Sequence, residues 1–156
     1  MNNWRLIVLL VSITFVLACK KGDDSTPVVD SPVNTWFYGA DSFKAAYSDI
    51  ILQKGFTLVF HPNPGFSGNE MISFTFRSKP STDGQYIPSK DTNSINTVIL
   101  KLGSDLGNYS SFDADTARLR ISFTDGKLNL KVWNVKMMRD TFPNDIVRLS
   151  VDLREF

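Results

Sequence analysis

Residues 119–133 read LRISFTDGKLNLKVW, and this stretch decides the fold. On both sides of Asp125-Gly126, apolar and polar residues alternate, which is the pattern of a strand that buries one of its faces. Asp-Gly is a strong signal for a two-residue hairpin turn, because both central residues must accept a positive φ. Such a turn places Thr124 opposite Lys127 and fixes how the two strands pair. We therefore predict a β-hairpin in this stretch.

The predicted hairpin has one apolar and one polar face. Counting away from the turn pairs the apolar residues of the two strands with one another, so we expect that face to meet the core. On the other face, Arg118 comes to lie opposite Trp133, and a cation next to a tryptophan can form a cation–π pair. The ring could also stack on a sugar or meet an acidic partner, or another strand could cover it. The candidate binding face consists of Arg118, Arg120, Lys131 and Trp133.

The same period of two recurs along most of the chain. It is clear in 71–76 and 146–153, and 35–38, 56–60 and 97–102 fit the same description. Turn residues such as glycine, proline, asparagine and aspartate separate these runs. We predict an all-β domain, an antiparallel β-sandwich of seven or eight short strands, with a β-barrel as the alternative.

One segment, Ser42 to Gly55, is ambiguous. Phe43, Tyr47 and Ile50 recur at helical spacing, and Ser42 and Gly55 would suit the two ends of a helix. However, the residues from 36 to 43, WFYGADSF, also fit two strands around a turn. We favour a hairpin that runs into a strand or an irregular segment, with a helix as the alternative.

The first eighteen residues have a different character from the rest. After a basic start, the run from Leu6 to Ala18 carries no charge. At about 1.5 Å per helical residue it is too short for a hydrocarbon core of about 30 Å, so a secretory signal peptide over 1–18 fits better than a membrane span. Val16 to Cys19 resembles the lipobox of bacterial lipoproteins. That resemblance implies that a diacylglycerol is attached to the Cys19 thiol and that this residue anchors the chain to a membrane.

Residues 19–33 begin with Cys19 and continue with charged and turn-forming residues, which predicts a flexible tether before the β domain at 34–156. Lys20 to Asp24 resembles the lysine-then-acidic tag of surface-exposed lipoproteins in Bacteroidota. Asn34–Gly39 with Ser42-Phe43, and also Pro80–Tyr86, are similar to segments of small β-rich lipoproteins of unassigned function in that phylum. The resemblance implies an outer-membrane protein at the cell surface, with the periplasmic face as the alternative.

Charge and composition make several functional classes improbable. Lys and Arg number 17 and Asp and Glu 16, so nothing in the charge balance suggests a nucleic-acid partner. A single histidine, His61, with no second histidine or free thiol, does not make a zinc site. No G-x-S-x-G motif is present for an acyl-transfer nucleophile. We predict no catalytic residue, metal or cofactor, and expect a non-enzymatic binding or assembly module whose partner is a glycan or a protein.

The alternative is a hydrolase of the cell envelope that acts on glycans or is assisted by calcium. It rests on three acids, Asp113, Asp115 and Glu70. Asp113-x-Asp115 would begin a calcium loop, but Arg118 stands at the sixth position, where the usual loop requires glycine.

Overall fold

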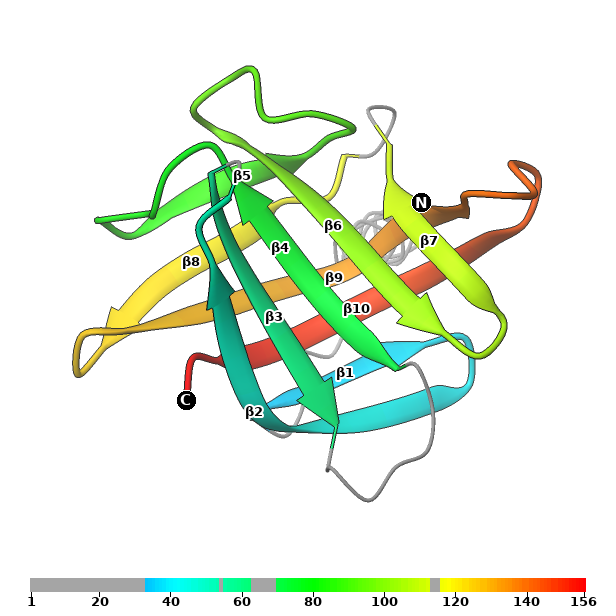
Figure 1. Cartoon of the computed structure of the whole chain (residues 1–156), viewed down its shortest axis with the longest axis horizontal. Coiled ribbons are helices and arrows are strands. Elements are labelled where there is room, and N and C mark those ends of the chain that lie inside the picture. The colour runs from blue at the N-terminus through cyan, green and yellow to red at the C-terminus, as the bar shows by residue number, and fades with distance from the viewer. Residues whose placement is uncertain (1–32, 54, 63–69, 113–115) are drawn as a thin grey trace, which may run out of the picture. The chain divides into compact units, whose positions relative to one another are not determined.

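The computed structural model describes residues 33–53, 55–62, 70–112 and 116–156, which form an all-β domain without helices (Figure 1). Ten strands are seen there, two more than the upper number predicted. The additional ones are the short β5 and β7, whose sequences GQYIP and GNYSS show no clear alternation. The strands are β1 (Thr35–Tyr38), β2 (Asp41–Ile51), β3 (Phe56–Pro62), β4 (Met71–Phe76), β5 (Gly84–Pro88), β6 (Thr97–Ser104), β7 (Gly107–Ser111), β8 (Leu119–Thr124), β9 (Lys127–Arg139) and β10 (Ile146–Arg154).

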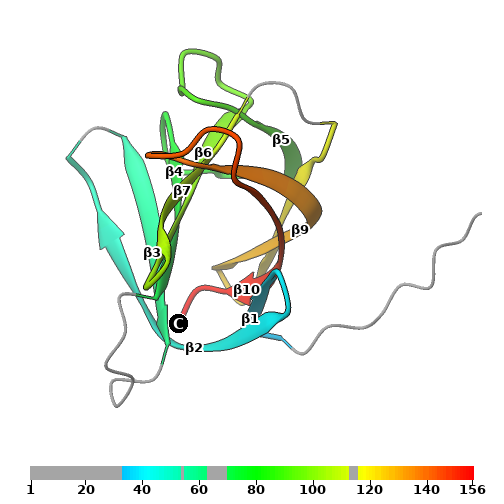
Figure 2. The ribbon, with the colours of Figure 1, turned by 90° about the vertical axis from the view of Figure 1, so that its right-hand side faces the viewer.

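All ten strands belong to one hydrogen-bonded sheet, in the order β10-β1-β2-β3-β4-β6-β5-β8-β9-β7. Two further pairings, β10 with β9 and β6 with β7, connect strands that lie apart in this order. The pairings are antiparallel except for β5 with β6, which is parallel, so the sheet is mixed and not purely antiparallel as predicted. Figure 2 shows the strands curving around one interior.

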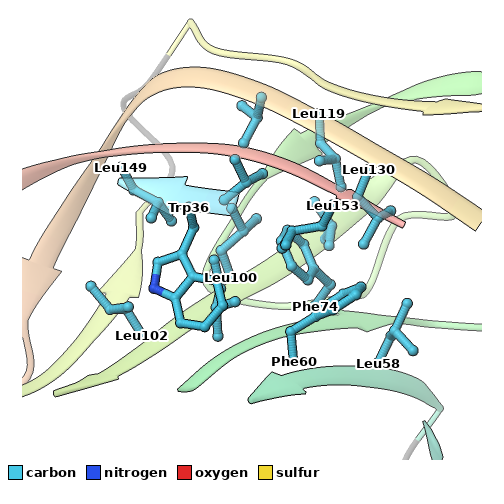
Figure 3. Close-up of a cluster of buried hydrophobic side chains, with 14 of the residues drawn as sticks. Trp36, Leu58, Phe60, Phe74, Leu100, Leu102, Leu119, Leu130, Leu149 and Leu153 are labelled. Carbon is cyan, nitrogen blue, oxygen red and sulfur yellow. The ribbon is translucent and has the colours of Figure 1, made fainter. Parts of the chain in front are cut away.

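Apolar side chains from every part of this sheet meet in that interior (Figure 3). Trp36, Phe60, Phe74 and Leu100 are completely buried, and the alternating patterns of the strands explain why. In β4 the residues are alternately exposed or half-buried and buried, so that one face meets the core and the other meets solvent. Burial of this apolar surface is the main favourable contribution to folding.

The Asp-Gly hairpin forms as predicted. Thr124 pairs with Lys127 and Ile121 with Leu130, in a ladder that extends to Arg120–Lys131. Asp125 and Gly126 have φ angles of 53° and 75°, so both central residues adopt the left-handed conformation. The pairs predicted further from the turn, including Arg118 with Trp133, lie outside this ladder.

The ambiguous segment forms a strand, β2, and the helical alternative is wrong. Its first residues, Asp41–Lys44, pair with β1 across a turn at Gly39-Ala40, as the favoured hairpin required. The remainder, Ala45–Ile51, pairs with β3 after an irregularity between Ala45 and Tyr47. Tyr47, Ile50 and Ile51 are exposed, so their helical spacing does not mark a buried helix face.

The N-terminal part of the chain lies outside the described residues. Contacts divide the chain into Met1–Asp30 and Ser31–Phe156, and everything described belongs to the second unit. The predicted signal peptide, Cys19 and all of the tether except Val33 are therefore not described. In the described part of the chain, no helix has the length and apolar character needed to cross a membrane.

Two glycines should differ sharply in their tolerance of a side chain. Gly55 has a φ of 115°, and a Cβ there would collide with the carbonyl oxygen of Phe76, whereas Gly126 has open space around it. We expect Gly126→Ala to lower the free energy of unfolding by about 1 kcal/mol through backbone strain alone. Gly55→Ala should cost more, because strain and collision add. Urea denaturation measures both effects.

The control for these variants is Gly84→Ala. Gly84 has no positive φ, and its added Cβ would make only an ordinary contact with the Tyr86 ring at 3.9 Å. Its unfolding midpoint should stay close to that of the unmodified protein. Equal midpoints for the three variants would contradict the assignment of strain.

Candidate functional site

A groove of about 710 Å³ lies on the solvent-facing side of β5, β8, β9 and β10. This volume falls within the range typical of small-molecule sites. Its apolar lining comes from Val33, Ile121 and Leu153. The polar side chains of its lining are Asp83, Gln85, Arg120, Ser122, Asn129, Lys131 and Asp152.

The strand pairing arranges these polar residues in two rows across the sheet. In the first row, Gln85 pairs with Arg120, Arg120 with Lys131, and Lys131 with Asp152. Ser122 and Asn129 form the second row. Because each row lies two residues from the other along a strand, the rows are separated by about 6.7 Å. The alternation that buries Ile121 thus also exposes Arg120 and Ser122.

The charges of the first row are only partly paired. Lys131 Nζ lies 3.0 Å from Asp152 Oδ2, and the two side chains form an ion pair in the groove lining. Arg120 is exposed and forms no ion pair with the described residues. It lies directly opposite Lys131 in the ladder. Like charges in that arrangement repel one another. Asp83, the other carboxylate of the groove lining, also forms no ion pair with the described residues, so the groove contains one unpaired cation and one unpaired carboxylate.

The second row offers neutral hydrogen-bonding groups. Asn129 Nδ2 donates to Thr124 Oγ1 at 2.9 Å and reaches Ser122 Oγ at 3.5 Å. Asp83 lies beside this row, and its Oδ1 accepts the Phe123 N–H at 3.1 Å. That contact uses one carboxylate oxygen of Asp83 to hold the loop before β5 against β8.

The structure brings together only part of the candidate binding face. Arg120 and Lys131 line the groove, whereas Arg118 and Trp133 do not. Trp133 is 39% exposed, so no strand covers it, and Lys131 Nζ lies 5.6 Å from its ring centroid. The cation beside the tryptophan is therefore Lys131 and not the predicted Arg118. Arg118 instead donates to the carbonyl oxygens of Thr116 and Ala117.

A local irregularity in β9 explains the position of Trp133. Val132 pairs with Val151, but Val135 pairs with Leu149, so β9 has one more residue than β10 between these pairs. Asn134 has a φ of 58°, and its N–H donates to Ser150 Oγ. This is a β-bulge, which leaves two consecutive residues, Trp133 and Asn134, exposed.

Five polar residues of the groove were not among the predicted site residues: Asp83, Gln85, Ser122, Asn129 and Asp152. Asp83 and Gln85 lie in Pro80–Tyr86, which was singled out for its resemblance to small β-rich lipoproteins and not as part of a site. β5 pairs with a strand more than thirty residues further along the chain. No local pattern indicates such a pairing. Asp152 had a usable signal, because it is the charged, outward-facing residue between Val151 and Leu153 in an alternating strand.

Glu70, one of the acids of the enzymatic alternative, is buried inside the domain and held there by hydrogen bonds. Its side chain is buried, and the Tyr38 hydroxyl donates to both carboxylate oxygens at 3.1 Å. The Asp105 N–H donates to Oε1 at 3.3 Å. Burial raises the pKa of Glu70, although these hydrogen bonds oppose the rise. Burial also raises the pKa of Tyr38, to about 12.

The other residues considered for catalysis or metal binding are His61, Asp113 and Asp115, and they form no catalytic or metal site among the described residues. Asp113 and Asp115 lie outside them. His61 stacks on Tyr47 with ring centroids 4.7 Å apart, and its Nε2 lies 3.3 Å from Asp49 Oδ2. Within the described ranges, no group of three or more histidine, cysteine, aspartate or glutamate side chains is placed to hold a metal ion.

The Tyr38–Glu70 pair should make stability depend on pH. Because the folded protein holds the Glu70 proton more tightly than the unfolded chain, stability gained from that proton is lost as pH rises from about the ordinary value of 4.5 through the raised pKa. Glu70→Gln, which cannot ionise, should therefore be more stable than the unmodified protein at pH 7. This advantage should shrink as the pH falls toward 4.5. Urea unfolding at several pH values measures it.

Tyr38→Phe should have the opposite sign. It removes a donor from a buried carboxylate, which should cost about 1–3 kcal/mol at pH 7 and less when Glu70 is protonated. Tyr109→Phe is the matched control, since Tyr109 is equally buried but donates to Asp145. A loss for Tyr38→Phe that does not vary with pH would contradict the role of the Glu70 charge.

No protein-family model matches the chain, and no curated protein or solved structure matches it either.

Proposed function

We propose that this protein is a membrane-anchored lipoprotein of the cell envelope, whose β domain binds a ligand in the groove on β5, β8, β9 and β10. The observation that carries the proposal is the convergence of polar side chains from four strands on one groove of about 710 Å³. Its charged lining residues are Asp83, Arg120, Lys131 and Asp152, and the last two neutralise one another in an ion pair. This arrangement favours a binding module over an enzyme.

The sheet that supports the groove is best interpreted as a closed barrel, the alternative to the predicted sandwich. The pairings of β10 with β9 and of β6 with β7 support this interpretation, because each of them joins strands that lie apart in the strand order. With the pairing of β10 and β9, the strand pairings from β10 to β9 form a closed ring. Closure would remove open sheet edges, which are places where strands of other chains could add. A rigid closed support would also hold the groove side chains at fixed spacing.

The anchor in this proposal is a lipid on Cys19, and the location is the outer membrane, on the cell surface. The support is the resemblance of Val16–Cys19 to a lipobox and of Lys20–Asp24 to a surface tag. Acyl chains stabilise membrane attachment by about 0.8 kcal/mol for each buried methylene group, so two or more chains hold a small protein firmly. The tether would place the groove beyond the lipid headgroups, where ligands can reach it.

Removal of the thiol tests the anchor. We expect cells fed with labelled palmitate to label the unmodified protein and not the Cys19→Ala variant, which should also fail to sediment with membranes. Cys19→Ser, which keeps the size of the side chain but not the thiol, is the matched variant and should behave in the same way. Labelling of either variant at the level of the unmodified protein would contradict the proposed anchor.

Filling the groove tests the binding function. Ser122→Leu combined with Asn129→Leu places two bulky apolar groups in the second row and removes its hydrogen bonds. We expect the affinity for the ligand to fall by about tenfold or more. Glycan binding is measured as retardation on gels that contain neutral or acidic polysaccharides, and protein binding as recovery of proteins from intact cells. Ser73→Leu, an outward-facing change on β4 outside the groove, should retain the affinity. Equal binding by the two variants would contradict a ligand site in the groove.

A further inference from the structure

The unpaired charge of Arg120 indicates what the groove would bind. Among the described residues Lys131 has Asp152 as its counter-ion, whereas Arg120 forms no ion pair, and Asp83, the remaining carboxylate of the groove, accepts the Phe123 N–H. Both cations nevertheless lie opposite one another on neighbouring strands. An anion held beside Arg120 would relieve this repulsion and compensate its charge. A planar guanidinium suits a carboxylate, because two parallel N–H groups can donate to the two carboxylate oxygens.

The other groove residues require a ligand that carries hydrogen-bonding groups in addition to a negative charge. Gln85 lies next to Arg120 in the first row, is exposed, and offers both a donor and an acceptor. Ser122 and Asn129, in the second row, add a hydroxyl and an amide. A ligand that satisfies both rows needs a carboxylate and, about 6.7 Å away, hydroxyl groups that donate and accept. One carboxylated sugar and its neighbour along a glycan chain supply that pattern.

We infer that the groove recognises an acidic glycan whose sugars carry carboxylates, such as a polyuronate; this inference rests on the proposed binding function. The carboxylate binds Arg120, and ring hydroxyls exchange hydrogen bonds with Gln85, Ser122 and Asn129. Trp133, exposed on the far side of Lys131, extends the surface on which a further sugar ring can lie. An acidic peptide would compensate the charge of Arg120 but would not place the hydroxyl groups of a sugar ring next to the second row.

The location of this site also predicts how binding responds to salt. Arg120 is exposed, so its attraction for an anion is screened as ionic strength rises. The neutral hydrogen bonds of the second row are not screened in this way. Binding of the acidic glycan should therefore weaken with added salt, without disappearing as a purely ionic attachment would.

The experiment compares polymers that differ only in charge. The full mature chain, in detergent, is titrated with polygalacturonate, with alginate, and with carboxyl-reduced polygalacturonate, which keeps the sugar linkage but lacks the charge. We expect at least one of the two uronates to bind about tenfold or more tightly than the reduced polymer, and Arg120→Gln to remove that preference. Lys101→Gln, an identical charge change at an exposed position of β6 outside the groove, should leave the preference intact.

Each other outcome has a defined meaning. Equal binding of charged and reduced polymers, still lost on groove filling, would overturn the acidic class and leave the proposed function standing. Poly-glutamate that binds as tightly as a uronate would show that charge alone suffices and would overturn the glycan. Failure of the folded protein to bind any of these polymers would overturn this inference, whereas groove filling without effect on any partner would overturn the proposed function itself.

Discussion

A residue on a β-strand can face the core or the solvent, but not both, and this constraint connects the groove to the interior of the domain. Ile121 and Leu130 pair across β8 and β9 with their side chains buried, so the adjacent Arg120 and Lys131 must pair on the outside. A slip of one residue would bury the charges and expose the apolar residues. The core therefore protects the arrangement of the groove, because any register that disturbs the groove also loses core packing.

Polar groups inside the domain follow a different rule from those on its surface. The Glu70 carboxylate is tolerated because the Tyr38 hydroxyl and the Asp105 N–H donate to it. Trp36 is the opposite case, since it is completely buried and its Nε1 has no hydrogen-bond partner among the described residues. Its large apolar ring offsets the cost of that unsatisfied donor. Glu70 therefore shows a buried polar group that is satisfied by hydrogen bonds, and Trp36 one whose cost is offset by apolar burial.

The parts of the fold that could be predicted are those that local sequence determines. The Asp125-Gly126 turn specified its own register, and alternation identified most long strands. Pairing between distant segments could not be predicted, which is why β5 and its groove residues were missed. Local spacing was also ambiguous in β2, where exposed apolar residues imitate a helix face. Arg118 was placed beside Trp133 by extending the ladder past its end, because a count along the chain does not reveal where pairing stops.

The bulge in β9 changes which residues of that strand are buried. Before it, the even-numbered Leu128, Leu130 and Val132 face the core, and after it the odd-numbered Val135 and Met137 do so. The additional residue shifts the phase of the alternation without breaking the strand. β9 can therefore pair with β8 in one phase near its start and with β7 in the other near its end, while β10 follows both halves. One continuous strand in this way pairs with two regions of the sheet. A strand with one uninterrupted alternation could not bury its apolar residues in both of them.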